Sequence, residues 1–266
     1  MIKTIIVIGV SIALGIICGS GCVYAFNHIP DEWLGTDEKG REWQRVKSVP
    51  WKYIFTATFI VVGIYLGIKD PHKAAGIYAA CLMLTEIAMA GFLYGRVPRP
   101  LVWLLALTGT GIIPFTIEED LGFGAGTAGM IKAHLAGAAA GFVILFILLI
   151  IKRMLMPSRG SLVSETDLAF CELGLALGLL CGPLEVSVII ATGIVLCGGY
   201  AVSKKFSGAG TAGALSGRER MSGEDSGFSE KSKDNNVKND ILEKRRISES
   251  FFVAAAAFFW LVVWPF

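Results

Sequence analysis

Long, continuous apolar runs constrain the fold of this chain more than any other feature of its sequence. A run of about 18 or more apolar residues can cross the hydrocarbon core of a bilayer as a helix. In that core only helices and closed barrels satisfy all their backbone hydrogen bonds. Because the runs are continuous rather than alternating, the sequence predicts an all-α, polytopic membrane protein with about eight transmembrane helices. The expected spans are 2–26, 53–68, 74–93, 101–115, 131–151, 168–181, 184–202 and 250–264, of which the fourth and the sixth are short for a complete crossing.

The distribution of charge supports this prediction and gives it an orientation. Only 17% of the 266 residues are charged, whereas soluble domains carry roughly 25%. Of the 24 Lys and Arg residues, 20 fall in the segments that follow the first, third, fifth and seventh spans. Positive charge marks the cytoplasmic side of a membrane protein. We therefore expect a multi-pass protein of the cell membrane with both termini outside.

The spans divide the chain into three expected regions. Residues 1–202 would form a membrane bundle of seven helices, with a short cytoplasmic loop at 27–52 whose mixed charge and Trp residues favour a small ordered cap. Residues 203–246 are rich in Gly, Ser, Lys, Asp and Asn, which predicts a flexible polar cytoplasmic linker. Residues 247–266 hold the last transmembrane helix. The first span could instead be a cleaved signal peptide, but its apolar stretch is long for one, which favours an uncleaved anchor.

Small residues and cysteines recur inside the spans. Gly137 and Gly141 enclose three alanines, and this spacing lets helix backbones approach closely, which favours a tight bundle. The six cysteines all lie inside apolar spans and form no CxxC pair, so neither a disulfide framework nor a zinc ribbon is predicted. The three histidines are far apart in the sequence and lack metal-ligand spacing. We expect no cofactor and no bound metal.

A series of motifs occurs along the chain in a fixed order. The first span ends in Gly19-Ser-Gly-Cys-Val-Tyr-Ala-Phe-Asn-His-Ile-Pro30, and the third is followed by Arg96-Val-Pro98. Together with the expected topology, these motifs resemble the type IV prepilin peptidases, a family of intramembrane aspartyl endopeptidases, over nearly the whole chain. In the sixth span the positions that keep the family's spacing are Leu173, Ala176, Leu177, Gly178, Gly182 and Pro183.

The resemblance implies a prepilin-peptidase-like bundle that acts in type IV pilus assembly or secretion. Members of this family cleave the leader peptides of type IV pilin-like precursors with two Asp residues near the cytoplasmic side. That chemistry needs two carboxylates, because one acts as the base while its neighbour holds a proton. In this chain Gly91 and Phe170 occupy the two positions, and neither side chain can carry a proton. The sequence therefore predicts a lost or rearranged dyad, and it leaves open whether the protein is an enzyme or a pseudoenzyme.

Two other acids, Asp167 and Glu86, are candidate catalytic residues in place of the missing pair. Asp167 precedes Phe170 by three residues, about 60° around a helix and about 4.5 Å along it; the alternative is that Asp167 caps the sixth helix. Glu86 precedes Gly91 by five residues, about 140° around and about 7.5 Å deeper. A carboxylate inside a span is a functional hypothesis by default, and the alternative here is a protonated Glu that is hydrogen-bonded to a neighbouring helix. We expect Gly91 and Phe170 to lie close together at the cytoplasmic end.

The expected partners follow from the membrane location and from the resemblance. They are membrane lipid and the N-terminal helices of prepilin-like proteins. A small-solute transporter or channel is the alternative from a different class, although no span is clearly broken in the way that many transporters use. The Glu118-Glu119-Asp120 cluster lies on the predicted outer side and is interpreted as a solvated loop. No phosphate-binding motif stands out, and no nucleic-acid partner is expected because the topology already explains the basic residues.

Overall fold

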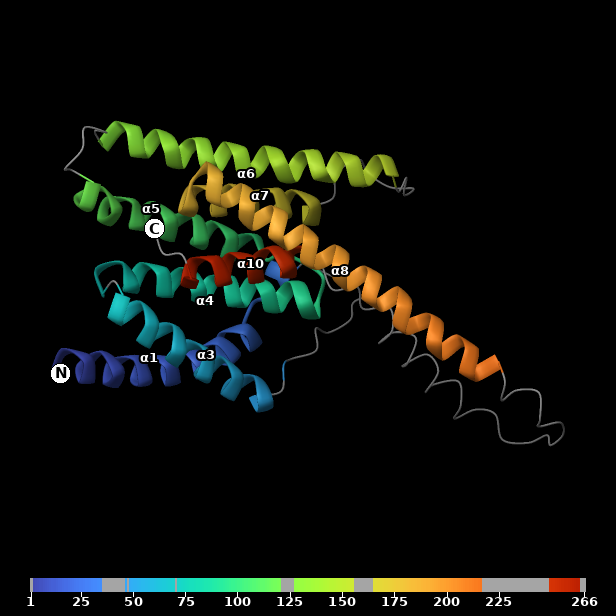
Figure 1. The fold of residues 1–266 in the computed structure, drawn as a ribbon, viewed down its shortest axis with the longest axis horizontal. Coiled ribbons are helices and arrows are strands. Elements are labelled where there is room, and N and C mark those ends of the chain that lie inside the picture. The colour runs from blue at the N-terminus through green and yellow to red at the C-terminus, as the bar shows by residue number, and fades with distance from the viewer. Residues whose placement is uncertain are drawn as a thin grey trace.

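The computed structural model, which describes residues 2–34, 46, 48–69, 71–120, 127–155, 165–216 and 249–263, is a bundle of helices (Figure 1). No strand occurs among these residues, which confirms the predicted all-α fold class. The helices are α1 (Ile2–Asn27), α2 (Asp31–Leu34), α3 (Ser48–Lys69), α4 (Pro71–Leu93), α5 (Arg99–Asp120), α6 (Thr127–Leu155), α7 (Glu165–Cys181), α8 (Pro183–Ser216) and α10 (Glu249–Val263).

Several of these helices are long and apolar enough to cross a membrane. In the part of the chain that the structure describes, the five that qualify contain the segments Thr4–Asn27, Ser48–Lys69, Ala74–Leu93, Ile131–Met154 and Pro183–Ser203. Helix α10 is apolar but has only 15 residues, and α5 and α7, which hold the short fourth and sixth expected spans, are not among the five. Helices long and apolar enough to span a membrane are thus confirmed, and the count of about eight crossings stays a prediction.

The long helices run alternately up and down the bundle (Figure 1). Helices α4 and α6 end, and α5 and α7 begin, at one end, which we call the basic end because Arg96, Arg99, Lys152 and Arg153 lie there. Helix α1 begins and α10 ends at the opposite end. The first and last helices thus have their outer ends on one side of the bundle, as the charge pattern predicts. Which side of a membrane this is stays a prediction.

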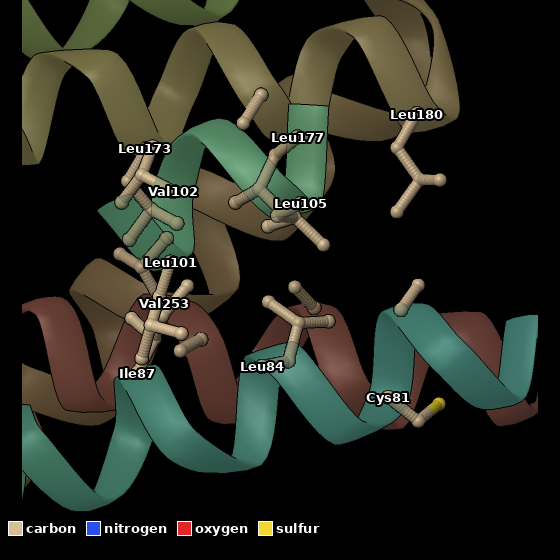
Figure 2. Close-up of a cluster of buried hydrophobic side chains, with 14 of the residues drawn as sticks. Cys81, Leu84, Ile87, Leu101, Val102, Leu105, Leu173, Leu177, Leu180 and Val253 are labelled. Carbon is tan, nitrogen blue, oxygen red and sulfur yellow. The ribbon is translucent and has the colours of Figure 1, made fainter. Parts of the chain in front are cut away.

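The core lies where α5 fits between α7 and the pair formed by α4 and α10 (Figure 2). Leu84 of α4, Leu105 of α5 and Leu177 of α7 are fully buried there, and Val253 reaches the same cluster from α10. Lipid is as apolar as these side chains, so such a core stabilises a bundle by close van der Waals packing more than by removing apolar surface from water.

Helices α6 and α7 approach each other through glycines on both sides. Gly137 and Gly141 of α6 lie opposite Gly178 and Gly174 of α7, respectively. A Cβ atom added at any of the four would overlap the backbone of the facing helix. The close approach that the sequence predicts at Gly137 and Gly141 is therefore confirmed, and its partner surface is the small-residue stripe of α7.

Helices α1 and α3 form a hairpin that is closed by a side-chain clamp. A Cβ atom added at Gly15 or Gly19 of α1 would overlap the backbone of α3, so these two helices also pack closely. At the basic end, the amide Nδ2 of Asn27 donates to the carbonyl of Val46 at 3.0 Å, and its Oδ1 accepts from the N–H of Val46 at 2.8 Å. This pair of hydrogen bonds brings the chain back to α1 just before α3 begins.

The helix bounds differ from two of the expected boundaries. Helix α8 continues to Ser216, so residues 203–216 of the expected linker are helical, and the rest of that linker lies outside the described residues. The segment 203–216 contains no proline, and extending an existing helix requires no new nucleation. Helix α3 begins at Ser48, inside the loop expected at 27–52. Most of the ordered cap that we expect in this loop lies outside the described residues.

Candidate functional site

The position of Gly91 is filled by the first turn of α10. A Cβ atom added at Gly91 would lie 2.7 Å from Oγ of Ser250 and 2.9 Å from the backbone nitrogen of Phe251. Ser250 is only 1% exposed, and the rings of Phe92 and Phe251 pack beside it with centroids 5.4 Å apart. There is consequently no space at this position for a carboxylate side chain unless α10 moves.

Phe170, which the resemblance assigns to the second catalytic position, lies near the start of α7. Its partly buried ring packs against the apolar core. Gly91 is near the end of α4 and Phe170 near the start of α7, so both lie at the basic end. Helix α4 packs against α5 and α10, whereas α7 packs against α5, α6 and α8. The two positions therefore lie at the same end of the bundle, and the helices that carry them both contact α5. Any bundle with this connectivity would produce this arrangement.

Asp167 forms an ion pair with Arg153. Its Oδ2 accepts a hydrogen bond from Nη2 of Arg153 at 2.7 Å, and about a quarter of each side chain is exposed. Arg153 is in the last turn of α6 and Asp167 is in the first turn of α7. Each charge therefore also suits the dipole of its own helix. The geometry gives Asp167 a role in joining α6 to α7 and does not direct it toward Gly91.

Glu172 is paired with Arg99, a contact that the sequence did not reveal. Nε of Arg99 donates to Oε2 of Glu172 at 3.0 Å, and Nη2 donates to Oε1 at 2.5 Å. Such bidentate pairs are among the strongest hydrogen bonds in proteins. Glu172 is 8% exposed, and the pair links the first residue of α5 to the middle of α7. The signal in the sequence was an acid inside an apolar span, Glu172, together with two Arg residues, Arg96 and Arg99, just before another span.

A third ion pair at the basic end anchors α10. Nζ of Lys152, in the last turn of α6, lies 2.8 Å from Oε1 of Glu249, the first residue of α10. Both side chains are about half exposed. Together with the pairs made by Asp167 and Glu172 of α7, this contact means that these three acids serve helix packing. None of these three acids faces another carboxylate in the contacts described.

Glu86 is different, because it is buried and has no charged partner in the part of the chain that the structure describes. Its side chain is 2% exposed, and neither carboxyl oxygen has a hydrogen-bond partner that meets geometric criteria among the described residues. The thiol of Cys22 in α1, itself 0% exposed, faces this carboxyl group. A thiol is a weak donor. Glu86 thus faces α1 and Gly91 faces α10, so the structure does not bring Glu86 and Asp167 together into a dyad.

The remaining sequence candidates lie away from this end or have structural partners. The Glu118-Glu119-Asp120 cluster is at the far end of α5, and its side chains lie outside the described residues. Nδ1 of His134 is 2.8 Å from the carbonyl oxygen of Leu179, which Pro183 cannot pair because proline has no N–H. Within the described residues, no group of three or more His, Cys, Asp or Glu side chains is placed to hold a metal ion.

Comparisons of the chain with protein-family models, with curated proteins and with solved structures find no match in any of the three.

Proposed function

We propose that this protein is a prepilin-peptidase-like membrane protein that binds the apolar N-terminal helix of pilin-like precursors and does not cleave it. The observation that carries the proposal is the contact of Gly91 with Ser250 and Phe251. The first position of the family's dyad has lost its carboxylate, and the space that a carboxylate would need holds the start of α10. Hydrolysis by this chemistry requires a second carboxyl group to share the proton, and Phe170 cannot supply it.

Binding without cleavage is a coherent function for such a bundle. Helix association in a membrane depends on close backbone approach and on van der Waals contact rather than on chemistry at one site. The glycine contacts of α6 with α7 and of α1 with α3 show that this chain uses that mode of packing internally. A precursor helix could be held in the same way, and competition for precursors or assistance in assembly would follow.

The alternative of an active peptidase requires Asp167 and Glu86 to work as a displaced pair. Against this, Asp167 faces Arg153 on α6 and Glu86 faces Cys22 on α1. A change that brought the two carboxyl groups together would have to break the ion pair and move α4 relative to α7.

The alternative of a small-solute transporter or channel draws on one observation. Glu86 is a buried carboxyl group inside a membrane helix, and such groups often mark ion or proton pathways. Transporter sites are commonly built from discontinuous helices. The described helices are continuous apart from Val49, whose non-helical backbone lies at the very start of α3. A flux assay in reconstituted vesicles separates this alternative from the proposal.

The proposal is tested by expressing the full chain with a type IV prepilin and reading the precursor's N-terminus by mass spectrometry. We expect the leader to stay intact. If a mature N-terminus appears, Asp167→Asn and Arg153→Gln must be compared, since both break the same ion pair. Loss of cleavage in Asp167→Asn alone would establish a catalytic carboxylate and refute the proposal. The protein's insertion must be verified in parallel by its recovery from the membrane fraction.

A further inference from the structure

The interface between α1 and α4 contains a carboxyl group that neither the bundle's ion pairs nor the proposed function uses. Glu86 is 2% exposed, its two oxygens have no hydrogen-bond partner among the described residues, and it faces the thiol of Cys22. Burying a charged group without a partner in an apolar environment is strongly unfavourable. In this packing Glu86 is therefore a neutral, protonated acid.

Among the described residues, no cation stands close enough to Glu86 to stabilise its charged form. Helix α4 is packed against α1, α3, α5 and α10. Cys22 is the titratable group that faces Glu86 from α1, and Cys18 lies one turn before it. The other charged groups with described side chains on the helices around α4 lie at helix ends: Lys52 and Lys69 on α3, Arg99 on α5, which is paired with Glu172, and Glu249 on α10, which is paired with Lys152.

Helix α1 is held to the bundle mainly by α3, and its contact with α4 is much smaller. It packs closely on α3 through Gly15 and Gly19. Its other contacts include Cys22 against Glu86 of α4 and the stacked rings of Phe26 and Tyr94, the residue that follows α4, whose centroids are 5.7 Å apart. A charge on Glu86 would thus appear in the middle of the surface that holds α1 to α4.

We propose that Glu86 is a proton-dependent latch: its protonated form allows α1 to pack against α4, and loss of the proton releases α1 from α4. The direction follows from linkage. A carboxyl group that is neutral in the packed state and charged in the open state contributes stability at low pH, and that stability falls as the pH rises. In the pH range where Glu86 has lost its proton in the open state and keeps it in the packed state, the ratio of open to packed protein rises about tenfold per pH unit. This inference does not depend on whether the protein binds prepilins.

The test is hydrogen exchange of the full-length protein in detergent micelles, read by mass spectrometry on peptides from α1 and from α6. Buried carboxyl groups titrate as high as about pH 8 to 9, so the comparison is made at about pH 6 and about pH 9.5. The control is Glu86→Gln, which has nearly the same shape and cannot ionise. After correction for intrinsic exchange, we expect equal protection of α1 in both proteins at the lower pH. At the higher pH, exchange of α1 should be at least about tenfold faster in the unchanged protein than in Glu86→Gln.

Peptides from α6 should exchange alike in both proteins at both pH values. Equal exchange of α1 in the two proteins at the higher pH would overturn the proposal. If Glu86→Gln does not fold, the test uses the unchanged protein alone. In that case, the same ratio of α1 to α6 protection at the two pH values would overturn the proposal.

Discussion

Arg99 and Glu172 form a bidentate ion pair across 73 residues of sequence, with Nε and Nη2 of the arginine 3.0 and 2.5 Å from the two carboxylate oxygens. The pair ties the start of α5 to α7 at the basic end, beside the region where the resemblance places catalytic chemistry. The acids of this region therefore contribute to stability, and that conclusion can be tested by mutation.

Glu172→Gln should lower the free energy of unfolding by about 1–2 kcal/mol, because Arg99 loses the charged partner of two hydrogen bonds and is itself partly exposed. Thermal unfolding of the purified protein in detergent measures the effect. Glu249→Gln breaks the more exposed pair with Lys152 and is the matched control, with an expected change of less than about 1 kcal/mol. If the two substitutions lower the free energy of unfolding equally, the pair of Arg99 and Glu172 contributes no more to stability than the more exposed pair of Lys152 and Glu249.

Gly178→Ala should destabilise the bundle by about 2 kcal/mol or more, since the added methyl group would overlap the backbone of α6 at Gly137. Gly198→Ala in α8 is the control, because nothing lies within 4 Å of a Cβ atom there. Alanine favours a helix over glycine, so the control should be neutral or more stable by up to about 1 kcal/mol. The same melting assay measures both, and a stable Gly178→Ala protein would contradict the close α6–α7 packing.

His134→Ala should cost about 1–2 kcal/mol, because it leaves the carbonyl of Leu179 without the donor that replaces the missing N–H of Pro183. His28→Ala provides the comparison. His28 follows directly after α1, and its exposed ring contacts Tyr24 of that helix, so this substitution should change stability by less than about 0.5 kcal/mol. If both variants melt alike, the hydrogen bond of His134 does not contribute.

Gly91→Asp introduces a carboxylate at the position that the resemblance assigns to the first catalytic Asp, and we expect it to weaken the docking of α10 without creating peptidase activity. Limited proteolysis near Glu249 and mass spectrometry of a co-expressed prepilin measure the two effects. Gly21→Ala, at an open position of α1, should leave both unchanged. Cleavage by Gly91→Asp would mean that α10 yields easily and that Phe170 is not the second position.

Much of the fold could be predicted because apolar runs and small-residue spacing act locally along the chain. Seven of the eight expected spans lie wholly in a helix, the last does so as far as Val263, and the spacing of Gly137 and Gly141 correctly indicates close packing. The pairings between helices could not be predicted in the same way. Arg99 with Glu172 and Gly91 with Ser250 depend on which faces of distant helices meet, and one sequence does not specify this.

The candidate site was predicted less completely than the fold. Glu86 and Asp167 stand out in the sequence as acids in or beside apolar spans, but their surroundings decide their roles. Arg153 neutralises Asp167, whereas the described side chain that faces Glu86 is the thiol of Cys22. The extension of α8 to Ser216 was missed because Gly, Ser and Lys suggest a linker when they are read without the long helix that precedes them.

The central claim is that the bundle binds a pilin-like precursor and leaves it uncleaved. Affinity purification of the full-length protein from cells that co-express a type IV prepilin, followed by intact-mass analysis of the co-purified precursor, tests both parts in one experiment. The account predicts recovery of prepilin with its leader intact, beyond the amount retained by an unrelated membrane protein of similar hydropathy. Recovery of mature pilin, or no recovery above that control, would contradict it.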